Sequence, residues 1–188
     1  MSAFFKPEAP FTEADLEMRI LEGPPPEGFE CNAEAQNRYL YDRARRDQRK
    51  SVSVTHLLFV KGIFAAYITL TADRIMLGPN EKPRGASYHI VPAMKIAQLA
   101  VDKSFAGLGL GKFLIGYAIE QATTMRAVIG CRYVTLDAEP HLIQWYEDQG
   151  FIQNQEEQVF RENLARERGR PVGDLPASMR FDLREAAA

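Results

Sequence analysis

Apolar and polar side chains follow two different periods in the second half of the chain. Residues 94–101 alternate with a period of two, as a half-buried strand does, and residues 131–138 repeat that alternation. Between these runs, residues 112–127 place apolar side chains three and four positions apart, which predicts a helix. Further helices are predicted from Pro140 to Gln149 and at 156–168, with a last strand at 178–183. Strands that alternate with helices in this way predict an α/β fold.

The first half predicts one helix and one hairpin. Residues 33–50 carry Ala35, Tyr39 and Leu40 on one side and basic side chains elsewhere, the pattern of an amphipathic helix with a wet, basic face. Two β-rich runs, 51–60 and 63–71, are separated by a short hairpin signal, and an exposed loop is predicted at 78–85. Residues 1–28, which include three consecutive prolines, are expected to form a peripheral N-terminal segment.

Length and composition favour one globular domain. The chain has 188 residues, close to the length of one domain, so a single domain is expected over residues 1–188. Apolar residues make up 46% and charged residues 26%, which excludes a wholly disordered chain. No apolar run approaches the roughly 18–20 residues of a membrane helix, and the N-terminus lacks the pattern of a secretory signal. A cytoplasmic protein without membrane contact is therefore expected.

Cysteine and histidine suggest no separate chemistry. Cys31 and Cys131 lie far apart in the sequence and are interpreted as reduced, unreactive thiols. His56, His89 and His141 do not have the spacing of metal ligands, so no metal is expected.

The net charge of −2 hides a local concentration of basic residues. From residue 38 to residue 50, six basic side chains stand against two acids. Such a run either contacts nucleic-acid phosphates or is an ordinary solvated helix face, and both interpretations stay open.

Three glycines stand between the strand at 94–101 and the helix that follows it. Glycines at the start of a helix let backbone approach a bulky anion, which the free amides and the positive end of the helix dipole then bind. The spacing of Gly107, Gly109 and Gly111 differs from a dinucleotide-binding fingerprint, and Lys112 is followed by Phe113 where a Walker A loop needs Ser or Thr. A tight turn without any ligand is the alternative.

The residues around these glycines resemble a known family. The run at 95–102 (KIAQLAVD), followed by Gly107-x-Gly109-x-Gly111, is similar to the acetyl-CoA-binding motif of the GNAT superfamily of N-acetyltransferases. The runs LDA at 136–138, WYE at 145–147 and GF at 150–151 resemble that superfamily's second signature. The resemblance implies an acetyl-CoA-binding core over 92–152. It also implies a mixed, mostly antiparallel sheet with a splayed central strand pair, flanked by helices.

The resemblance also assigns roles to residues. Tyr146 would give a proton to the departing CoA thiolate, and Lys112 would either help to bind the pyrophosphate or be an ordinary solvated residue. Ala106 stands where the superfamily usually has Gln or Arg, which removes one contact but leaves the backbone amides. The implied acetyl-CoA-binding residues are Leu99, Ala100 and Val101 on the strand and Ala106, Gly107, Leu108, Gly109, Leu110, Gly111 and Lys112 after it.

Within the superfamily the chain looks most like the toxins that acetylate aminoacyl-tRNA. The runs FEC at 29–31 and SVT at 53–55 and the basic helix match that branch loosely. The resemblance implies a tRNA acceptor held by Arg43 and Arg46, with an antitoxin partner and with homodimerisation left open. No general base is evident, and an α-amine with a pKa of about 7.7–8.0 has less need of one than a lysine side chain. The alternatives are a small-molecule or protein amine as acceptor, or a CoA-binding protein without catalysis.

Overall fold

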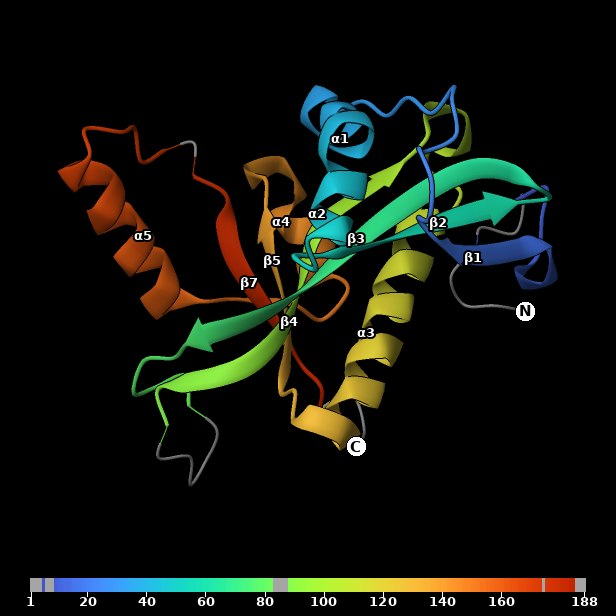
Figure 1. Cartoon of the computed structure of the whole chain (residues 1–188). Helices are drawn as coiled ribbons and strands as arrows, with labels where there is room; N and C mark the ends of the chain where they lie inside the picture. Colours follow the sequence, from blue (N-terminus) through green and yellow to red (C-terminus); the bar gives the residue numbers. More distant parts are fainter. Residues whose placement is uncertain (1–4, 6–8, 83–87, 174, 185–188) are drawn as a thin grey trace. The chain divides into compact units, whose positions relative to one another are not determined.

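The computed structural model describes residues 5, 9–82, 88–173 and 175–184. Its strands form a seven-stranded sheet in the order β1-β2-β3-β4-β5-β7-β6, with helices flanking it (Figure 1). The chain divides into two compact units, Met1–Thr71 with Ile96–Ala118, and Ala72–Lys95 with Ile119–Ala188. They are called unit 1 and unit 2 below. The predicted α/β fold class with a mostly antiparallel sheet is confirmed.

Unit 1 contains an antiparallel meander. Strand β1 (Leu16–Ile20) pairs with β2 (Val54–Val60), which pairs in turn with β3 (Ile63–Met76). The hairpin between β2 and β3 turns at Lys61 and Gly62, which have φ angles of 49° and 79°. Glycine reaches such angles without a steric penalty, so this turn is the predicted hairpin. The last part of β4 (Ile90–Val101) and the first part of α3 (Leu110–Ile129) complete the unit.

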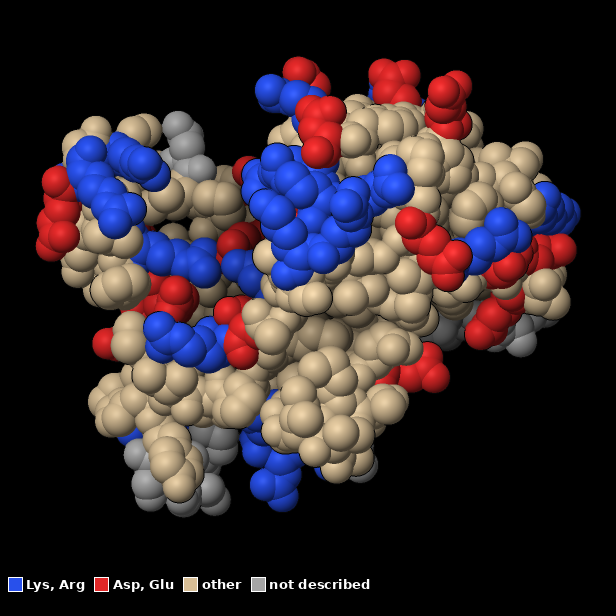
Figure 2. Space-filling model, in the orientation of Figure 1, with Lys and Arg blue, Asp and Glu red and all other residues tan. Residues whose placement is uncertain are grey.

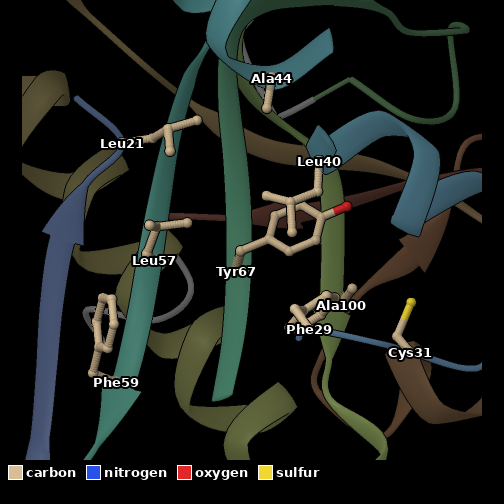
Figure 3. Close-up of a cluster of buried hydrophobic side chains, with 9 residues drawn as sticks. All are labelled: Leu21, Phe29, Cys31, Leu40, Ala44, Leu57, Phe59, Tyr67 and Ala100. Carbon is tan, nitrogen blue, oxygen red and sulfur yellow. The ribbon is translucent and has the colours of Figure 1, made fainter. Parts of the chain in front are cut away.

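The predicted helix at 33–50 is built from three consecutive helical segments. These are α1 (Glu34–Arg38), a π-helical stretch (Tyr39–Ala44) and α2 (Arg45–Arg49). The segment packs its apolar side on the sheet, where Leu40 and Ala44 are fully buried. Figure 3 shows the cluster that results, with side chains from the helical segment facing those from the strands. Its members are Leu21, Phe29, Cys31, Leu40, Ala44, Leu57, Phe59, Tyr67 and Ala100.

The N-terminal segment contributes more structure than the sequence predicts. It forms a short 3₁₀ helix (Glu13–Asp15) and the edge strand β1, neither of which the pattern of apolar residues indicated. Phe11 and Leu21 flank this strand and are only 5% and 2% exposed. The segment therefore adds an edge strand to the sheet and side chains to the core.

Unit 2 is held together by β5 and β7. Strand β5 (Tyr133–Ala138) pairs antiparallel with β7 (Ala177–Asp182), and β7 pairs with the two-residue β6 (Ile152–Gln153). The 3₁₀ helix Pro140–Leu142 leads into α4 (Ile143–Glu147). Along the chain, α5 (Gln155–Glu167) follows β6 and precedes β7. The helices and strands predicted for unit 2 are thus present, and β6 was not predicted.

The loop after β3 closes onto the start of α5. The carboxylate of Glu81 accepts the backbone N–H groups of Gln155 (2.9 Å) and Glu156 (3.2 Å), so a residue far away in sequence caps this helix. Glu81 also accepts from Arg180 at 2.9 Å, and both side chains are less than 10% exposed. Part of the predicted loop at 78–85 lies outside the described residues. No helix among the described residues is long and apolar enough to cross a membrane.

Candidate active site

The glycine cluster forms the turn between β4 and α3 in unit 1. Gly107 and Gly109 have φ angles of 76° and 98°, in the left-handed region that glycine adopts most readily. The carbonyl of Gly109 accepts the N–H of Phe113 at 3.1 Å, which closes the first turn of the helix. The amides of Leu110, Gly111 and Lys112 precede that bond and have no carbonyl partner within the helix. This end of α3 therefore presents backbone donors and the positive end of the helix dipole.

In the loop between β4 and α3, some backbone N–H groups donate hydrogen bonds to carbonyls of the same loop. The 3₁₀ helix Lys103–Phe105 follows β4, and the N–H of Ala106 bonds the carbonyl of Lys103 at 3.3 Å. The N–H of Leu108 reaches the carbonyl of Phe105 at 3.4 Å, a long bond that leaves it weakly held. Of the amides predicted to bind phosphate, that of Leu108 therefore has a weak internal partner, whereas those that begin α3 do not.

Asp102 fixes the end of β4 and the start of this loop. One carboxylate oxygen accepts the N–H of Glu30 at 2.8 Å, and the other accepts the N–H and the hydroxyl of Ser104 at 2.9 and 2.5 Å. Its own N–H donates to the carbonyl of Ala65 at 2.8 Å. Burial alone raises the pKa of Asp102, but the donated hydrogen bonds from Glu30 and Ser104 outweigh it, and the pKa lies below its usual value. Asp102 is thus an ionised anchor. It holds the loop between β4 and α3, called the glycine loop below because it contains Gly107 and Gly109, against the segment at residue 30.

The strand residues that were predicted to bind acetyl-CoA lie at the C-terminal end of β4. Leu99 and Val101 are half-buried and Ala100 is buried in the unit 1 core. Lys112 is exposed in the first turn of α3, where both of its predicted roles remain open. Aromatic side chains of the N-terminal segment pack beside this region: Phe11 lies 6.5 Å from Phe105 and Phe5 lies 6.0 Å from Phe113, measured between ring centroids.

Tyr146 lies in unit 2, on α4. Its side chain is 7% exposed and packs edge-on against Trp145 and Phe151, with ring centroids 4.8 and 5.8 Å away. Burial raises the pKa of its phenol to about 12, so the hydroxyl stays protonated at neutral pH. Among the described residues no side chain or carbonyl hydrogen-bonds that hydroxyl. A protonated phenol without an internal partner can serve as a hydrogen-bond or proton donor, and its predicted role as general acid stays a prediction.

Figure 2 shows basic side chains gathered over α2. Arg43 and Arg46 are 60% and 56% exposed, and each lies within 4 Å of Asp47, at 3.8 and 3.5 Å. Arg45, Arg49 and Lys50 have no ion-pair partner in the part of the chain that the structure describes. A hollow of about 430 Å3 is lined by Tyr41, Asp42, Arg45, Arg46, Arg49 and Lys50.

The hollow therefore includes Arg46 but not Arg43, the other predicted acceptor-binding residue. Three basic residues that the sequence prediction did not select have charges less compensated than those of Arg43 and Arg46. The four-residue spacing of Arg43 and Asp47 is a signal for one of these ion pairs, whereas the pairing of Arg46 with its neighbour Asp47 depends on side-chain conformation. The hollow is basic enough to bind a polyanion.

His56 is half-buried and both cysteines are buried, whereas His89 and His141 are exposed. The Nδ1 atom of His56 lies 2.9 Å from the hydroxyl of Tyr117, and burial lowers the pKa of His56. Cys31 and Cys131 are both buried, and burial raises the pKa of the Cys131 thiol. Among the described residues no group of His, Cys, Asp and Glu is arranged to hold a metal ion.

The chain is similar to known proteins at the level of family and fold. Residues 27–165 match the family model described as acetyltransferase (GNAT) domain. A solved bacterial toxin has a TM-score of 0.73 at 16% identity, with 90% of this chain and 92% of that chain covered. A structure of AtaT complexed with acetyl-methionyl-tRNAfMet has a TM-score of 0.67 at 23% identity, covering 74% and 88%. A mutant of AtaT bound to the C-terminus of the antitoxin AtaR and acetyl-CoA has a TM-score of 0.68 at 20% identity, covering 91% and 95%. At such identities the likeness concerns the fold.

Proposed function

Because this chain belongs to the acetyltransferase (GNAT) family, we propose that it transfers an acetyl group from acetyl-CoA to the α-amino group of aminoacyl-tRNA. We further propose that it acts as the toxin of a toxin–antitoxin pair. In the reaction the amine nitrogen attacks the thioester carbonyl carbon, the carbon–sulfur bond breaks, and the amine loses a proton while the thiolate gains one.

The glycine loop is the observation that carries the proposal. The backbone turns at Gly107 and Gly109 and leads into α3, so the amides of Leu110, Gly111 and Lys112 lie at a helix N-terminus and have no carbonyl partner within the helix. A diphosphate suits such a site because it accepts hydrogen bonds and is stabilised by the helix dipole. The residues present therefore fit acetyl-CoA without the long side chain that Ala106 replaces. The backbone of Leu99, Ala100 and Val101 would bond the pantetheine arm, as the family resemblance implies.

Tyr146 is proposed as the proton donor to the CoA thiolate. Support comes from its place in the family's second signature and from its buried, protonated phenol. A phenol with a pKa of about 12 donates hydrogen bonds at neutral pH and does not act as a base. An α-amine with a pKa of about 7.7–8.0 depends less on a base to reach its neutral form than a lysine side chain does, and the proton that it loses after attack passes to solvent.

The acceptor is proposed from two supports. AtaT, a structural relative, has been solved with acetyl-methionyl-tRNAfMet and with the antitoxin AtaR. The exposed basic side chains on α2 provide the charge that a tRNA backbone requires, with affinity that falls as salt rises. Arg43 and Arg46 are retained as predicted contacts, and Arg45 and Arg49 are added because no ion pair offsets them among the described residues.

The experiment supplies labelled acetyl-CoA with either charged or uncharged tRNA. Label on charged tRNA alone supports the proposal, whereas label on a protein or small amine alone identifies a different acceptor. Label on no acceptor, with acetyl-CoA bound, indicates a binding protein without catalysis.

Charge reversal tests the RNA surface. In Arg45→Glu/Arg49→Glu, acetylation of tRNA should fall at least tenfold while acetyl-CoA affinity is unchanged. The matched control is Arg19→Glu, another exposed arginine of unit 1, whose partner Glu17 lies on β1. Equal losses in both variants would argue against α2 as the tRNA surface.

A further inference from the structure

A second basic feature lies at the C-terminal end of α5 in unit 2. A pocket of about 190 Å3 opens there between the last turns of the helix and the chain that returns towards β7. Its apolar lining, called the apolar floor below, is made by Leu164, Ala165, Leu175 and Pro176, and its cationic groups are Arg161, Arg168 and Arg170. The volume is below the roughly 300–1,000 Å3 of a site for a drug-sized molecule, so it suits a single ring or side chain.

The backbone places these arginines through a helix-terminating motif. The N–H of Arg170 donates to the carbonyl of Ala165 at 2.8 Å, and that of Gly169 donates to Arg166 at 3.0 Å. Gly169 has a φ of 65°, so the chain reverses here in a Schellman motif. Because the motif uses backbone atoms only, the side chains of Arg168 and Arg170 are left for other contacts.

The charges in the pocket are unevenly compensated. Arg161 lies 2.6 Å from Asp137 and 3.2 Å from Glu157, which neutralise it. Arg168 and Arg170 are exposed and have no ion pair or side-chain hydrogen bond in the described part of the chain. Arginines near the end of a helix also offset its dipole, but the motif already satisfies the terminal carbonyls. Two guanidinium groups above an apolar floor thus remain without a structural task.

We propose that this pocket binds one unpaired nucleotide of an RNA, with its base on the apolar floor and its phosphates on Arg168 and Arg170. Guanidinium groups bind phosphate oxygens through two parallel hydrogen bonds, and unpaired bases stack on guanidinium planes. The aliphatic side chains of the pocket add apolar surface that a base can bury. The inference rests on the proposed function, because it assigns a contact for the RNA that serves as acceptor. Figure 2 shows basic side chains on this end of α5, at the upper left.

The test measures RNA binding without chemistry. Fluorescence anisotropy would follow a short single-stranded RNA and an uncharged tRNA, in the absence of acetyl-CoA, from 50 to 200 mM salt. For Arg168→Ala/Arg170→Ala, the slope of log affinity against log salt for the single strand should fall by about 1.4, since each lost phosphate contact accounts for about 0.7. The control Arg166→Ala lies on the same helix and is paired with Glu162 at 3.1 Å, so its slope should not change. The fold is preserved in each, because the helix end depends on backbone atoms.

A second comparison tests for the base. An abasic RNA of equal length should bind wild type several-fold more weakly, because no base then buries apolar surface against Leu164, Leu175 and Pro176, and Leu164→Ala should reduce that difference. An unchanged slope in Arg168→Ala/Arg170→Ala, or equal slopes for it and the Arg166→Ala control, would overturn the inference. If bases contribute equally in wild type and Leu164→Ala, the base-binding part is wrong. Failure to acetylate charged tRNA would instead refute the proposed function, because RNA binding is measured independently of it.

Discussion

Removing the carboxylate of Asp102 should both destabilise the protein and weaken acetyl-CoA binding. The change Asp102→Ala takes away the acceptor for two backbone N–H groups, those of Glu30 and Ser104, and for the Ser104 hydroxyl. A hydrogen bond to a charged group contributes about 1.5–3 kcal/mol. Asp102 is 9% exposed, so water reaches the released groups in part, and the sum over the two backbone donors falls to about 2–4 kcal/mol.

Loss of the Asp102 carboxylate should also loosen the glycine loop. Ser104 lies in the 3₁₀ helix that leads from β4 to Gly107, and the carboxylate of Asp102 fixes it. With that bond gone, the loop must be ordered when acetyl-CoA binds, and each 1.4 kcal/mol of ordering weakens affinity tenfold. We expect acetyl-CoA affinity to fall by about tenfold or more.

Two measurements check this reasoning. Urea unfolding followed by circular dichroism gives the stability difference, and calorimetric titration with acetyl-CoA gives the affinity. Asp148→Ala is the control, since Asp148 is an exposed acid whose side chain bonds only Gln144 among the described residues, and its stability should stay within about 0.5 kcal/mol of wild type. An Asp102→Ala protein that is as stable as this control refutes the anchoring role. A destabilised protein with unchanged affinity shows that the anchor does not position the loop.

Three further predictions concern side chains that are buried or whose pKa is shifted. Tyr146→Phe should slow thiol release from acetyl-CoA by about 10²–10⁴-fold while leaving acetyl-CoA affinity unchanged, and unaltered turnover would exclude Tyr146 as proton donor. The pKa of Asp102 is lowered in the folded state, so its ionised carboxylate stabilises the fold. The difference in unfolding free energy between wild type and Asp102→Asn should therefore be constant above about pH 5 and shrink as pH falls below about 4, towards the folded pKa. Urea midpoints at several pH values measure this difference. Glu81→Gln should cost about 3–5 kcal/mol in urea unfolding, since it leaves buried Arg180 without its carboxylate, and a loss below 1 kcal/mol would contradict this.

The strand, turn and helix that are proposed to bind acetyl-CoA were largely predictable because their signals are local. A period of two followed by glycines and then by a period of three and four predicts strand, turn and helix in that order, and the structure has β4, the turn at Gly107 and Gly109, and α3. The family resemblance was read from the same residues, and the match over residues 27–165 confirms it. Local periodicity and turn chemistry are the features that sequence reports most directly.

Features that depend on distant contacts were missed. Strand β1 is short and half-exposed, and only its pairing with β2 makes it a strand. Glu81 caps α5 from a loop more than seventy residues earlier, whereas Asn154, the N-cap residue that the sequence offers next to the helix, makes no side-chain cap hydrogen bond. Asp102 was part of the recognised motif, but its bond to Glu30 joins segments that only the fold brings together.

The π-helical stretch of the basic helical segment was not predicted. The fully buried Leu40 and Ala44 are four positions apart, and the half-buried Gln36 and Gln48 lie a further four positions to either side, although Asn37, Tyr39 and Asp47 are half-buried too. In a regular α-helix each step of four overshoots one turn by about 40°, so three steps would rotate the apolar side well away from the sheet. A π-helical stretch turns less per residue, because its hydrogen bonds span five residues, and the stretch at Tyr39–Ala44 returns the face to the core. The π-helical stretch thus keeps Leu40 and Ala44 buried, while the arginines around them stay on the outside, where the proposed RNA contact requires them.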